Sequence, residues 1–281
     1  MIAVAPAEAY SRALQTDRQL KRIRMLHLPI IIIPDIQGEY GRLAALLSWL
    51  EAHKYLTTHQ LAFLGDIIDG GYQAREVVDI ISALLKDGHL LIAGNHECIL
   101  EMACWEADIS VRETYAQMWL HGYEKNTLSS YGIKKRISDP LATAEAMRIR
   151  LEELGHDKVL RGLPLYIEYN PYILVHAGIL AESSWASQKA ALDDRRVSIM
   201  QEAPQVFSAK IAANLVSTDD MCVVSGHRRD ALNPIITPYR ARLDCGSGHG
   251  GPLIAWITDE ALVIKSHGDD NIKAVPISPL E

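Results

Sequence analysis

The sequence of 281 residues has few aromatic residues and no excess of positive charge. Phe, Trp and Tyr make up 6% of the chain, which is little material for a surface that stacks nucleic acid bases. The 28 Lys and Arg are outnumbered by 35 Asp and Glu, and a net charge of −7 disfavours binding to a phosphate backbone. We therefore expect no nucleic acid polymer as a partner.

Long apolar runs and disulfide patterns are also missing. The longest apolar run, around residues 30–33, is far too short to cross a bilayer, and residues 1–14 lack the pattern of a secretory signal. The four cysteines form no Cys-x-x-Cys pair and no framework spacing. We therefore expect a cytoplasmic protein with reduced thiols and no membrane partner. A hydrophobic fraction of 48% is enough to bury a core and excludes intrinsic disorder.

The first hundred residues alternate between two kinds of apolar segment. Short runs at residues 28–34, 60–64 and 89–93 predict buried strands. Residues 40–53 and 74–86 carry apolar side chains at helical spacing. Three strand–loop–helix units in succession predict an α/β layered fold with a parallel sheet.

The rest of the chain changes character twice. Residues 98–160 are rich in Glu, Ala, Met, Leu and Arg with helical periodicity, which predicts a helical insertion or cap. Hairpin-like spacing from residue 163 onward predicts a second, antiparallel sheet packed on the first. Its expected strands are residues 165–169, 172–175, 221–224, 235–237, 253–257 and 261–265. We expect residues 1–24 to form a peripheral helix or arm, and residues 25–281 to form one domain.

Polar residues follow five of the expected strands directly. Ligands of α/β sheets bind at the carboxyl ends of strands, where loops project side chains into one crevice. An Asp there usually caps a helix and a lone His is usually structural, but five such endings beside glycines are hard to explain by capping. Carboxylate, amide and imidazole groups suit Mn²⁺, Fe or Zn²⁺. The residues in question are Asp35, Gln37, Asp66, Asp69, Asn95, His96, His176 and His227.

The segments that contain these residues read DIQG, GDIIDGG, GNHE, VHAG and GH. They resemble the signature blocks of the calcineurin-like metallophosphoesterases, above all the phosphoprotein phosphatase branch with bacterial protein phosphatases and diadenosine tetraphosphatases. Weaker similarity extends to residues 127–132, 163–165 and 244–251. The resemblance implies a two-sheet sandwich flanked by helices, in four layers α/β/β/α, with the helical insertion beside the metal site.

The resemblance also implies a role for each residue. Two divalent metal ions would activate water as the nucleophile. His96 would protonate the leaving oxygen, and Asp69 would orient its imidazole ring. Asn95 would also contact the phosphate. The implied metal ligands are Asp35 and Gln37 for the first ion, Asp66 bridging both, and Asn95, His176 and His227 for the second ion.

The sequence departs from the family pattern at two positions. Gln37 stands where the family has histidine, and an amide oxygen favours a hard cation, so we expect Mn²⁺ before Fe or Zn²⁺. Gly70 stands where the family has an arginine that clamps phosphate, which glycine cannot replace. Arg228, which follows His227 and precedes Arg229, is our candidate substitute.

For other polar and aromatic residues we expect structural or surface roles. We expect Glu97 to support its loop, His249 to serve a glycine-rich turn, and Trp105 and Trp119 to pack in the core. Arg195 and Arg196 are the second option for a phosphate clamp, and solvated surface charge is the more ordinary role for them. The histidines expected on the surface are His53, His59, His121, His156 and His267.

The sequence therefore favours a metal-dependent phosphomonoesterase of the serine/threonine or tyrosine protein phosphatase type. Its partners would be phosphorylated proteins or small phosphoesters. Hydrolysis of dinucleoside polyphosphates or nucleotides is the alternative within enzymes. A non-catalytic module that binds a phosphorylated partner is the alternative from another class, because Gln37 and Gly70 both depart from the family pattern.

Overall fold

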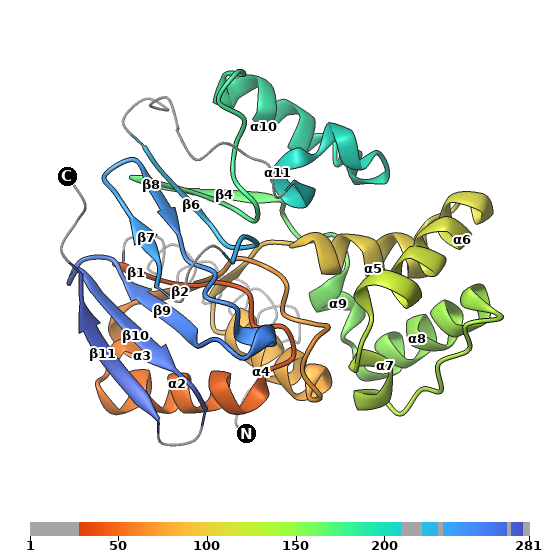
Figure 1. Cartoon of the computed structure of the whole chain (residues 1–281), viewed down its shortest axis with the longest axis horizontal. Coiled ribbons are helices and arrows are strands. Elements are labelled where there is room, and N and C mark those ends of the chain that lie inside the picture. The colour runs from red at the N-terminus through yellow and green to blue at the C-terminus, as the bar shows by residue number, and fades with distance from the viewer. Residues whose placement is uncertain (1–27, 209–220, 230–232, 269–270, 278–281) are drawn as a thin grey trace, which may run out of the picture.

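The computed structural model describes residues 28–208, 221–229, 233–268 and 271–277, so the arm expected at residues 1–24 lies outside it. Within these residues the strands form two sheets (Figure 1), with the orders β11-β10-β9-β1-β2-β3 and β4-β5-β6-β8-β7. The strands are β1 (Ile30–Ile33), β2 (Gln60–Phe63), β3 (Leu90–Leu91), β4 (Tyr166–Tyr169), β5 (Tyr172–Val175), β6 (Cys222–Ser225), β7 (Ile235–Ile236), β8 (Arg240–Arg242), β9 (Leu253–Ile257), β10 (Leu262–Ser266) and β11 (Ile272–Pro276).

The first sheet combines a parallel half with an antiparallel half. β1, β2 and β3 pair in parallel, as the three strand–loop–helix units predict. β9 pairs antiparallel with β1, and β10 and β11 follow it. Our assignment of residues 253–257 and 261–265 to the second sheet was therefore wrong. All five residues of β9 are buried, and alternate ones contact different cores, which requires an inner position in a sheet covered on both faces.

The second sheet is mixed, and the expected antiparallel arrangement was wrong. β5 and β6 are parallel, and so are β6 and β8. Parallel neighbours need a crossover connection, which the long segment between β5 and β6 provides and which includes a helix that we did not predict, α10 (Trp185–Asp193). β8 and β11 were not predicted either. β8 reads Arg-Ala-Arg, and β11 is an edge strand with mostly exposed side chains.

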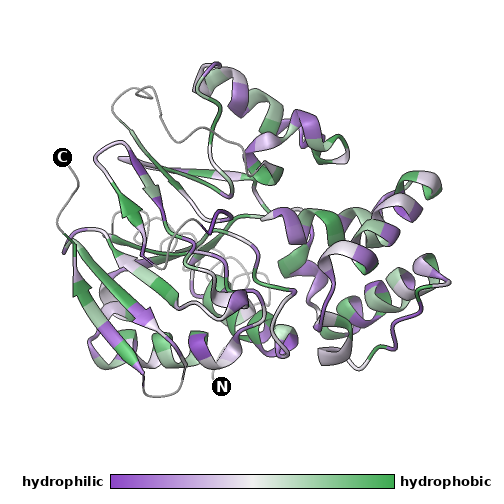
Figure 2. Cartoon of the chain, viewed as in Figure 1, coloured by the Kyte–Doolittle hydropathy of each residue, from purple (hydrophilic) through white to green (hydrophobic). Residues whose placement is uncertain are grey.

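The alternating side chains of β1 explain the layers. Ile31 and Ile33 belong to the core between the first sheet and its helices, whereas Ile30 and Ile32 belong to the core between the two sheets. A third, smaller core lies between the second sheet and Trp185 of α10. The result is the expected order of helices, sheet, sheet and helices (Figure 1), with hydrophobic residues concentrated in the strands (Figure 2).

The helices flank the sheets and extend beyond them on one side, where α5 to α9 lie together (Figure 1). Within the described residues no helix is long and apolar enough to span a membrane. The helices are α2 (Tyr40–Ala52), α3 (Tyr55–Thr58), α4 (Ala74–Lys86), α5 (Asn95–Trp105), α6 (Ile109–Met118), the π-helix η1 (Trp119–Tyr123), α7 (Thr127–Ser130), α8 (Pro140–Leu154), α9 (Asp157–Leu160), α10, the short 3₁₀ turns η2 (Arg196–Ser198), η3 (Met200–Glu202) and η4 (Ser247–His249), and α11 (Pro204–Phe207).

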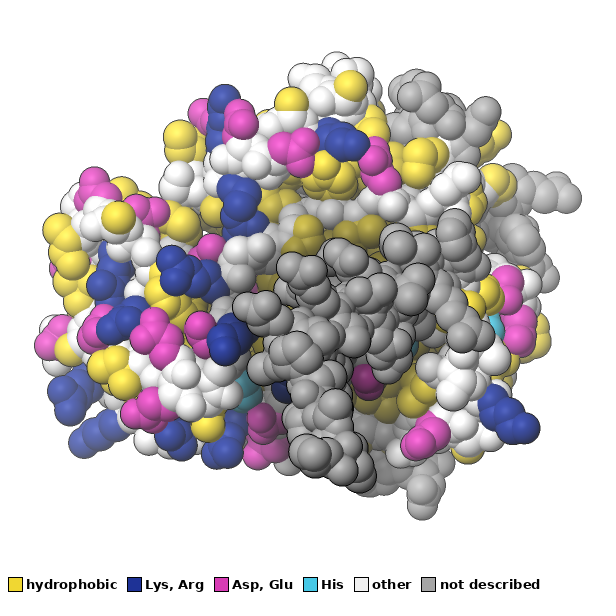
Figure 3. Space-filling view, turned by 180° about the vertical axis from the view of Figure 1, so that it is seen from behind, with side chains coloured by type: hydrophobic (Ala, Val, Ile, Leu, Met, Phe, Trp, Pro, Cys, Tyr) yellow, Lys and Arg dark blue, Asp and Glu magenta, His cyan; other side chains and the backbone are white. Residues whose placement is uncertain are grey.

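The helical segment of residues 98–160 has an apolar inner side and a charged surface. α8 begins where Asp139 accepts a hydrogen bond from the Ala142 N–H at 3.0 Å and Pro140 occupies the first turn. On its outer side Arg148 bonds Glu145 and Glu152. Positive and negative side chains are accordingly interspersed over this part of the surface in Figure 3.

Candidate metal and phosphate site

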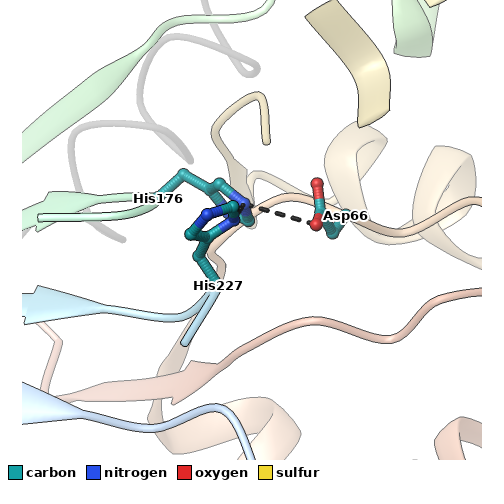
Figure 4. A group of neighbouring side chains, drawn as sticks. All are labelled: Asp66, His176 and His227. Carbon is teal, nitrogen blue, oxygen red and sulfur yellow. Dashed lines mark hydrogen bonds and ion pairs between the residues drawn. The ribbon is translucent and has the colours of Figure 1, made fainter. Parts of the chain in front are cut away.

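The polar residues that follow β1, β2, β3, β5 and β6 meet around one cavity of about 190 Å³. Asp35 and His176 lie buried behind it. Figure 4 shows the two histidine rings, from the ends of β5 and β6, directed toward Asp66 at the end of β2. The cavity is lined by Gln37, Asp66, Asp69, Gly70, Asn95, His96, Gly122, Tyr123, Lys125, His227, Arg229 and His249.

Ligand atoms of Asp66, His176 and His227 lie within 4.8 Å of one another, which suits a shared cation. Nε2 of His176 is 3.3 Å from Oδ2 of Asp66, and it lies 2.9 Å from Oδ1 of Asn95. Nδ1 of His176 is 2.7 Å from the Leu64 carbonyl, to which it donates, so Nε2 faces the cluster. This is the arrangement by which a backbone acceptor orients a metal-binding histidine.

Charge in this cluster is balanced by shifted pKa values. Burial disfavours charge on both groups, but mutual attraction raises the pKa of His176 to about 10 and holds the pKa of Asp66 well below its usual range. Burial and the charge of His176 lower the pKa of His227 to about 4. Within this cluster the buried carboxylate of Asp66 therefore faces one cationic ring, His176, and one neutral ring, His227. A divalent ion would replace the proton of His176 and use both rings as ligands.

Asp35 and Gln37 lie beside this cluster. With them lies Asp244, a third carboxylate besides those of Asp66 and Asp35, which the sequence analysis did not single out. Both carboxylate oxygens of Asp35 accept a hydrogen bond from the main-chain N–H of His227, each at 3.0 Å. Burial and then the negative charge of Asp244 raise the pKa of Asp35, while burial raises the pKa of Asp244 to about 6. Buried carboxylates that repel one another fit an oxygen-lined site for a hard cation.

Two glycines make room for the Gln37 side chain. A Cβ atom on Gly248 would lie 2.1 Å from Oε1 of Gln37, and one on Gly70 would lie 3.1 Å from its Cβ. Gln37 is therefore held against the cavity wall in the space that these two residues leave open. The contact with Gly248 was not visible in the sequence, because the two residues lie more than two hundred positions apart.

His96 is oriented by Asp69, as the resemblance implies. Its Nδ1 is 2.8 Å from Oδ2 of Asp69, and its Nε2 lies toward the cavity, 3.7 Å from Oδ2 of Asp66. Burial opposes the charge of the ring, but Asp66 and the hydrogen bond to Asp69 raise the pKa of His96 to about 9. A protonated imidazole at this position can give a proton to a leaving group.

The loop that carries Asp66 is fixed by the buried carboxylate of Glu97. Glu97 accepts main-chain N–H groups of Asp66 at 2.7 Å, Ile67 at 2.9 Å and Gly94 at 2.9 Å. These bonds agree with the supporting role expected for Glu97. They also help to hold Asp66 in the left-handed region, at φ 49°, which non-glycine residues seldom adopt.

Four of the site residues share this unusual backbone conformation. Asp69, with φ 60°, and His227, with φ 61°, adopt it as Asp66 does, and so does Gln37, with φ 50°. Such backbone strain is retained where the surrounding contacts require it, and it is typical of functional sites. Four of the seven described non-glycine residues with positive φ thus belong to the site.

The cations at the cavity are not the one that we selected. Arg228 does not line the cavity. Burial lowers the pKa values of Arg240 and Arg242, and the positive charge of the nearby Arg228 lowers them further. Arg229 and Lys125 line the cavity instead. Lys125 was missed because it lies in the helical insertion, outside every motif.

Arg195 and Arg196, the second option for a clamp, are paired elsewhere. Nη2 of Arg195 is 2.7 Å from Glu101, and Arg196 bonds Asp194 and Glu202. These pairings match the surface-charge role that we considered the more ordinary one. Neither arginine lines the cavity.

Two of the five histidines expected on the surface are buried, so that prediction was wrong for them. Nε2 of His59 is 3.2 Å from Asp259, and Nε2 of His156 is 3.0 Å from Asp79. Long-range carboxylate partners allow both rings to be buried. The exposed ones are His53, His121 and His267.

Three further residues, for which we expected purely structural roles, differ in whether they contact the site. Trp119 is fully buried and Trp105 is partly buried against the same core. Trp119 also donates to Asp69 at 3.2 Å, a contact with the site that the sequence did not indicate. His249 belongs to the short turn η4, but it also lines the cavity.

A larger cavity of about 380 Å³ lies between the two sheets, away from these residues. Its wall includes Tyr172, Ile236 and Trp256. No carboxylate, lysine, arginine or histidine lines it among the described residues, so it lacks the groups that the cavity beside Asp66 brings together.

Comparison with known proteins places this site in a family. The family model for calcineurin-like phosphoesterases matches residues 28–231. A cold-active protein-tyrosine phosphatase from a psychrophilic Shewanella species superposes with a TM-score of 0.50 at 18% identity, covering 88% of this chain and 80% of that one. At such identity the likeness concerns the fold.

Two further solved structures superpose over most of their length. A candidate diadenosine tetraphosphatase has a TM-score of 0.48 at 20% identity, covering 88% of this chain and 92% of that one. A protein serine/threonine phosphatase from Saccharomyces cerevisiae has a TM-score of 0.44 at 12% identity, covering 99% and 92%.

Proposed function

The chain belongs to the calcineurin-like phosphoesterase family and is a phosphoester hydrolase, and we propose that it is a metal-dependent phosphomonoesterase acting on phosphorylated proteins or small phosphoesters. One observation supports this proposal above the others. His96, held by Asp69 at 2.8 Å, opens onto the same small cavity as the cluster of Asp66, His176 and His227. A proton donor and a cation site thus face one space.

We propose that the donor atoms hold two divalent cations, one of them at the cluster of Asp66, His176 and His227. Bound ions would supply an activated water molecule and offset the negative charge of the phosphoryl oxygens. We propose Mn²⁺ for this chain, because oxygen donors dominate the first position and an amide replaces imidazole at Gln37. The residues proposed to hold the ions are Asp35, Gln37 and Asp66 at one position and Asp66, Asn95, His176 and His227 at the other.

The chain's own groups bind the phosphate and deliver the proton. Lys125 and Arg229 line the cavity, and neither has a carboxylate within 4.0 Å among the described residues. Cations on the wall of a cavity are suited to an anionic substrate. His96 would give its Nε2 proton to the leaving oxygen, while the hydrogen bond of Asp69 to Nδ1 stabilises the charged ring.

The size of the cavity favours a monoester over a nucleotide. Its volume of about 190 Å³ lies below the ~300 Å³ at which pockets for drug-sized ligands begin. It therefore accommodates a phosphoryl group and the first atoms of the leaving group. The remainder of the substrate would lie outside, next to the helical segment, which suits a protein side chain or a small ester.

Hydrolysis by metal-stripped protein tests the proposal. Mn²⁺, Mg²⁺ or Zn²⁺ is added back with p-nitrophenyl phosphate, a phosphoserine, phosphothreonine or phosphotyrosine peptide, or a dinucleoside tetraphosphate. We expect metal-dependent release of phosphate from the monoesters and none from the Asp66→Asn variant. Turnover confined to the dinucleotide would refute the monoesterase proposal in favour of nucleotide hydrolysis. Stoichiometric metal binding without turnover of any substrate would leave the phospho-partner binding module.

A further inference from the structure

Asp69 has more partners than the histidine that it orients. Its side chain is fully buried, and both of its oxygens accept hydrogen bonds. Oδ2 accepts from Nδ1 of His96 at 2.8 Å and from Nε1 of Trp119 at 3.2 Å. Oδ1 accepts from the hydroxyl of Thr127 at 2.6 Å. Neither Trp119 nor Thr127 belongs to the strand-end loops that supply the other site residues.

Thr127 bonds Asp69 twice. Its Oγ1 donates to the carboxylate and also accepts the Asp69 main-chain N–H at 2.9 Å. The neighbouring Asn126 donates from Nδ2 to the Gly70 carbonyl at 2.5 Å. Asn126, which precedes α7, and Thr127, its first residue, therefore hold both the backbone and the side chain of the loop after β2. Because Thr127 is fully buried, water is not available to replace its hydroxyl.

These contacts fix a torsion that is otherwise soft. The χ2 torsion of an aspartate has a broad energy minimum, so one hydrogen bond leaves the carboxylate free to rotate. Thr127 at one oxygen and Trp119 at the other define its plane. A rotated carboxylate would weaken the bond to His96 and turn the opposite ring nitrogen away from the leaving group.

We propose that Thr127 and Trp119 are positioning residues, through which the helical segment beside the cavity sets the orientation of the proton donor His96. The general acid is then assembled between the sheet edge and the helical segment, rather than by the strand-end loops alone. This inference rests on the proposed phosphomonoesterase function. It assigns the two residues no contact with substrate.

Aryl phosphates with leaving groups of graded acidity test the proposal. Thr127→Val keeps the shape of the side chain and removes the hydroxyl, while Thr127→Ser restores it. A good leaving group such as 4-nitrophenolate needs little protonation, whereas phenolate needs it. We expect Thr127→Val to lower kcat for phenyl phosphate about tenfold, the order of one lost charge-assisted hydrogen bond, and to change kcat for p-nitrophenyl phosphate much less. Thr127→Ser should recover most of the loss.

Two further variants separate positioning from packing. Thr143→Val removes another buried threonine hydroxyl of the same segment, one that bonds only the backbone of residues 136 and 139, and should leave the leaving-group dependence unchanged. Trp119→Phe keeps one aromatic six-membered ring and removes the N–H donor together with the five-membered ring. It should steepen the dependence as Thr127→Val does, and it serves if the valine variant does not fold in thermal unfolding.

The outcomes distinguish this inference from the proposed function. An equal loss of kcat for all leaving groups in Thr127→Val, or no loss, would overturn the positioning role while leaving metal-dependent hydrolysis by the unsubstituted chain intact. Absence of hydrolysis by the unsubstituted chain with any added metal would overturn the proposed function, and this inference with it.

Discussion

Replacing Glu97 by glutamine tests the support of the Asp66 loop. Oε2 of Glu97 accepts the N–H groups of Asp66 and Gly94, and Oε1 accepts that of Ile67 at 2.9 Å. With the amide oxygen at the Oε2 position, a glutamine keeps the first two bonds and turns an NH₂ group toward the Ile67 N–H. An unsatisfied buried donor costs about 1–3 kcal/mol, and two bonds lose their charge assistance at roughly 1 kcal/mol each.

Part of this loss is offset. Burial and the charge of Asp66 raise the pKa of Glu97, so the neutral amide also relieves an unfavourable buried charge. We therefore expect a net loss of about 2 kcal/mol in the free energy of unfolding. That loss corresponds to a Tm lower by about 4–8 °C.

Glu101→Gln, on the same helix α5, is the matched control. Glu101 is partly exposed and pairs with Arg195, so its loss should cost about 1 kcal/mol or less. Urea unfolding of both variants and of the unsubstituted chain supplies the comparison, and metal binding by Glu97→Gln should weaken as well. Equal unfolding free energies for the two variants would refute the idea that Glu97 fixes the loop.

Three other predictions concern the cavity wall and the fold. A Cβ atom introduced by Gly248→Ala would lie 2.1 Å from Oε1 and 2.7 Å from Cβ of Gln37, so this variant should displace the whole Gln37 side chain, lower stability and weaken one of two Mn²⁺ affinities measured by calorimetry. Gln37→His should shift metal preference toward Zn²⁺, and unchanged metal binding in both variants would exclude Gln37 as a ligand. Lys125→Ala and Arg229→Ala should each raise KM for p-nitrophenyl phosphate about tenfold, and an unaltered KM would show that they do not hold the phosphate. Burial lowers the pKa of His89, whose Nδ1 accepts a main-chain N–H of β2 at 3.0 Å. The stabilisation by the neutral ring is therefore present above pH 6.5 and is lost as the pH falls. The difference in urea unfolding free energy between the unsubstituted chain and His89→Asn should shrink with falling pH, and a constant difference would contradict this.

The sequence predicted those parts of the fold and site that local patterns encode. A short apolar run followed by Gly-Asp or Gly-Asn-His indicates a strand end, so the loops with Asp66 and Asn95 were found before the structure. The helix at residues 74–86 and the strand at 253–257 have the bounds that their periodicity predicts. The sheet that a strand joins depends on distant partners, and so the place of β9 was predicted wrongly.

The missed residues share a physical reason. Lys125 lines the cavity and Trp119 bonds Asp69 only because the helical segment folds back against the strand ends, and no spacing in the sequence encodes these contacts. His156 is buried because Asp79 and Tyr131, remote in sequence, satisfy its two ring nitrogens at 3.0 and 2.8 Å. Local composition around a histidine does not reveal such partners.

Titration of metal-stripped protein with Mn²⁺, with bound metal and p-nitrophenyl phosphate hydrolysis measured in the same samples, tests the central claim most directly. The account predicts two equivalents of Mn²⁺ per chain, hydrolysis that rises as they bind, and neither full binding nor turnover in Asp66→Asn. Full occupancy without hydrolysis of any phosphomonoester, or hydrolysis that persists in Asp66→Asn, would contradict it.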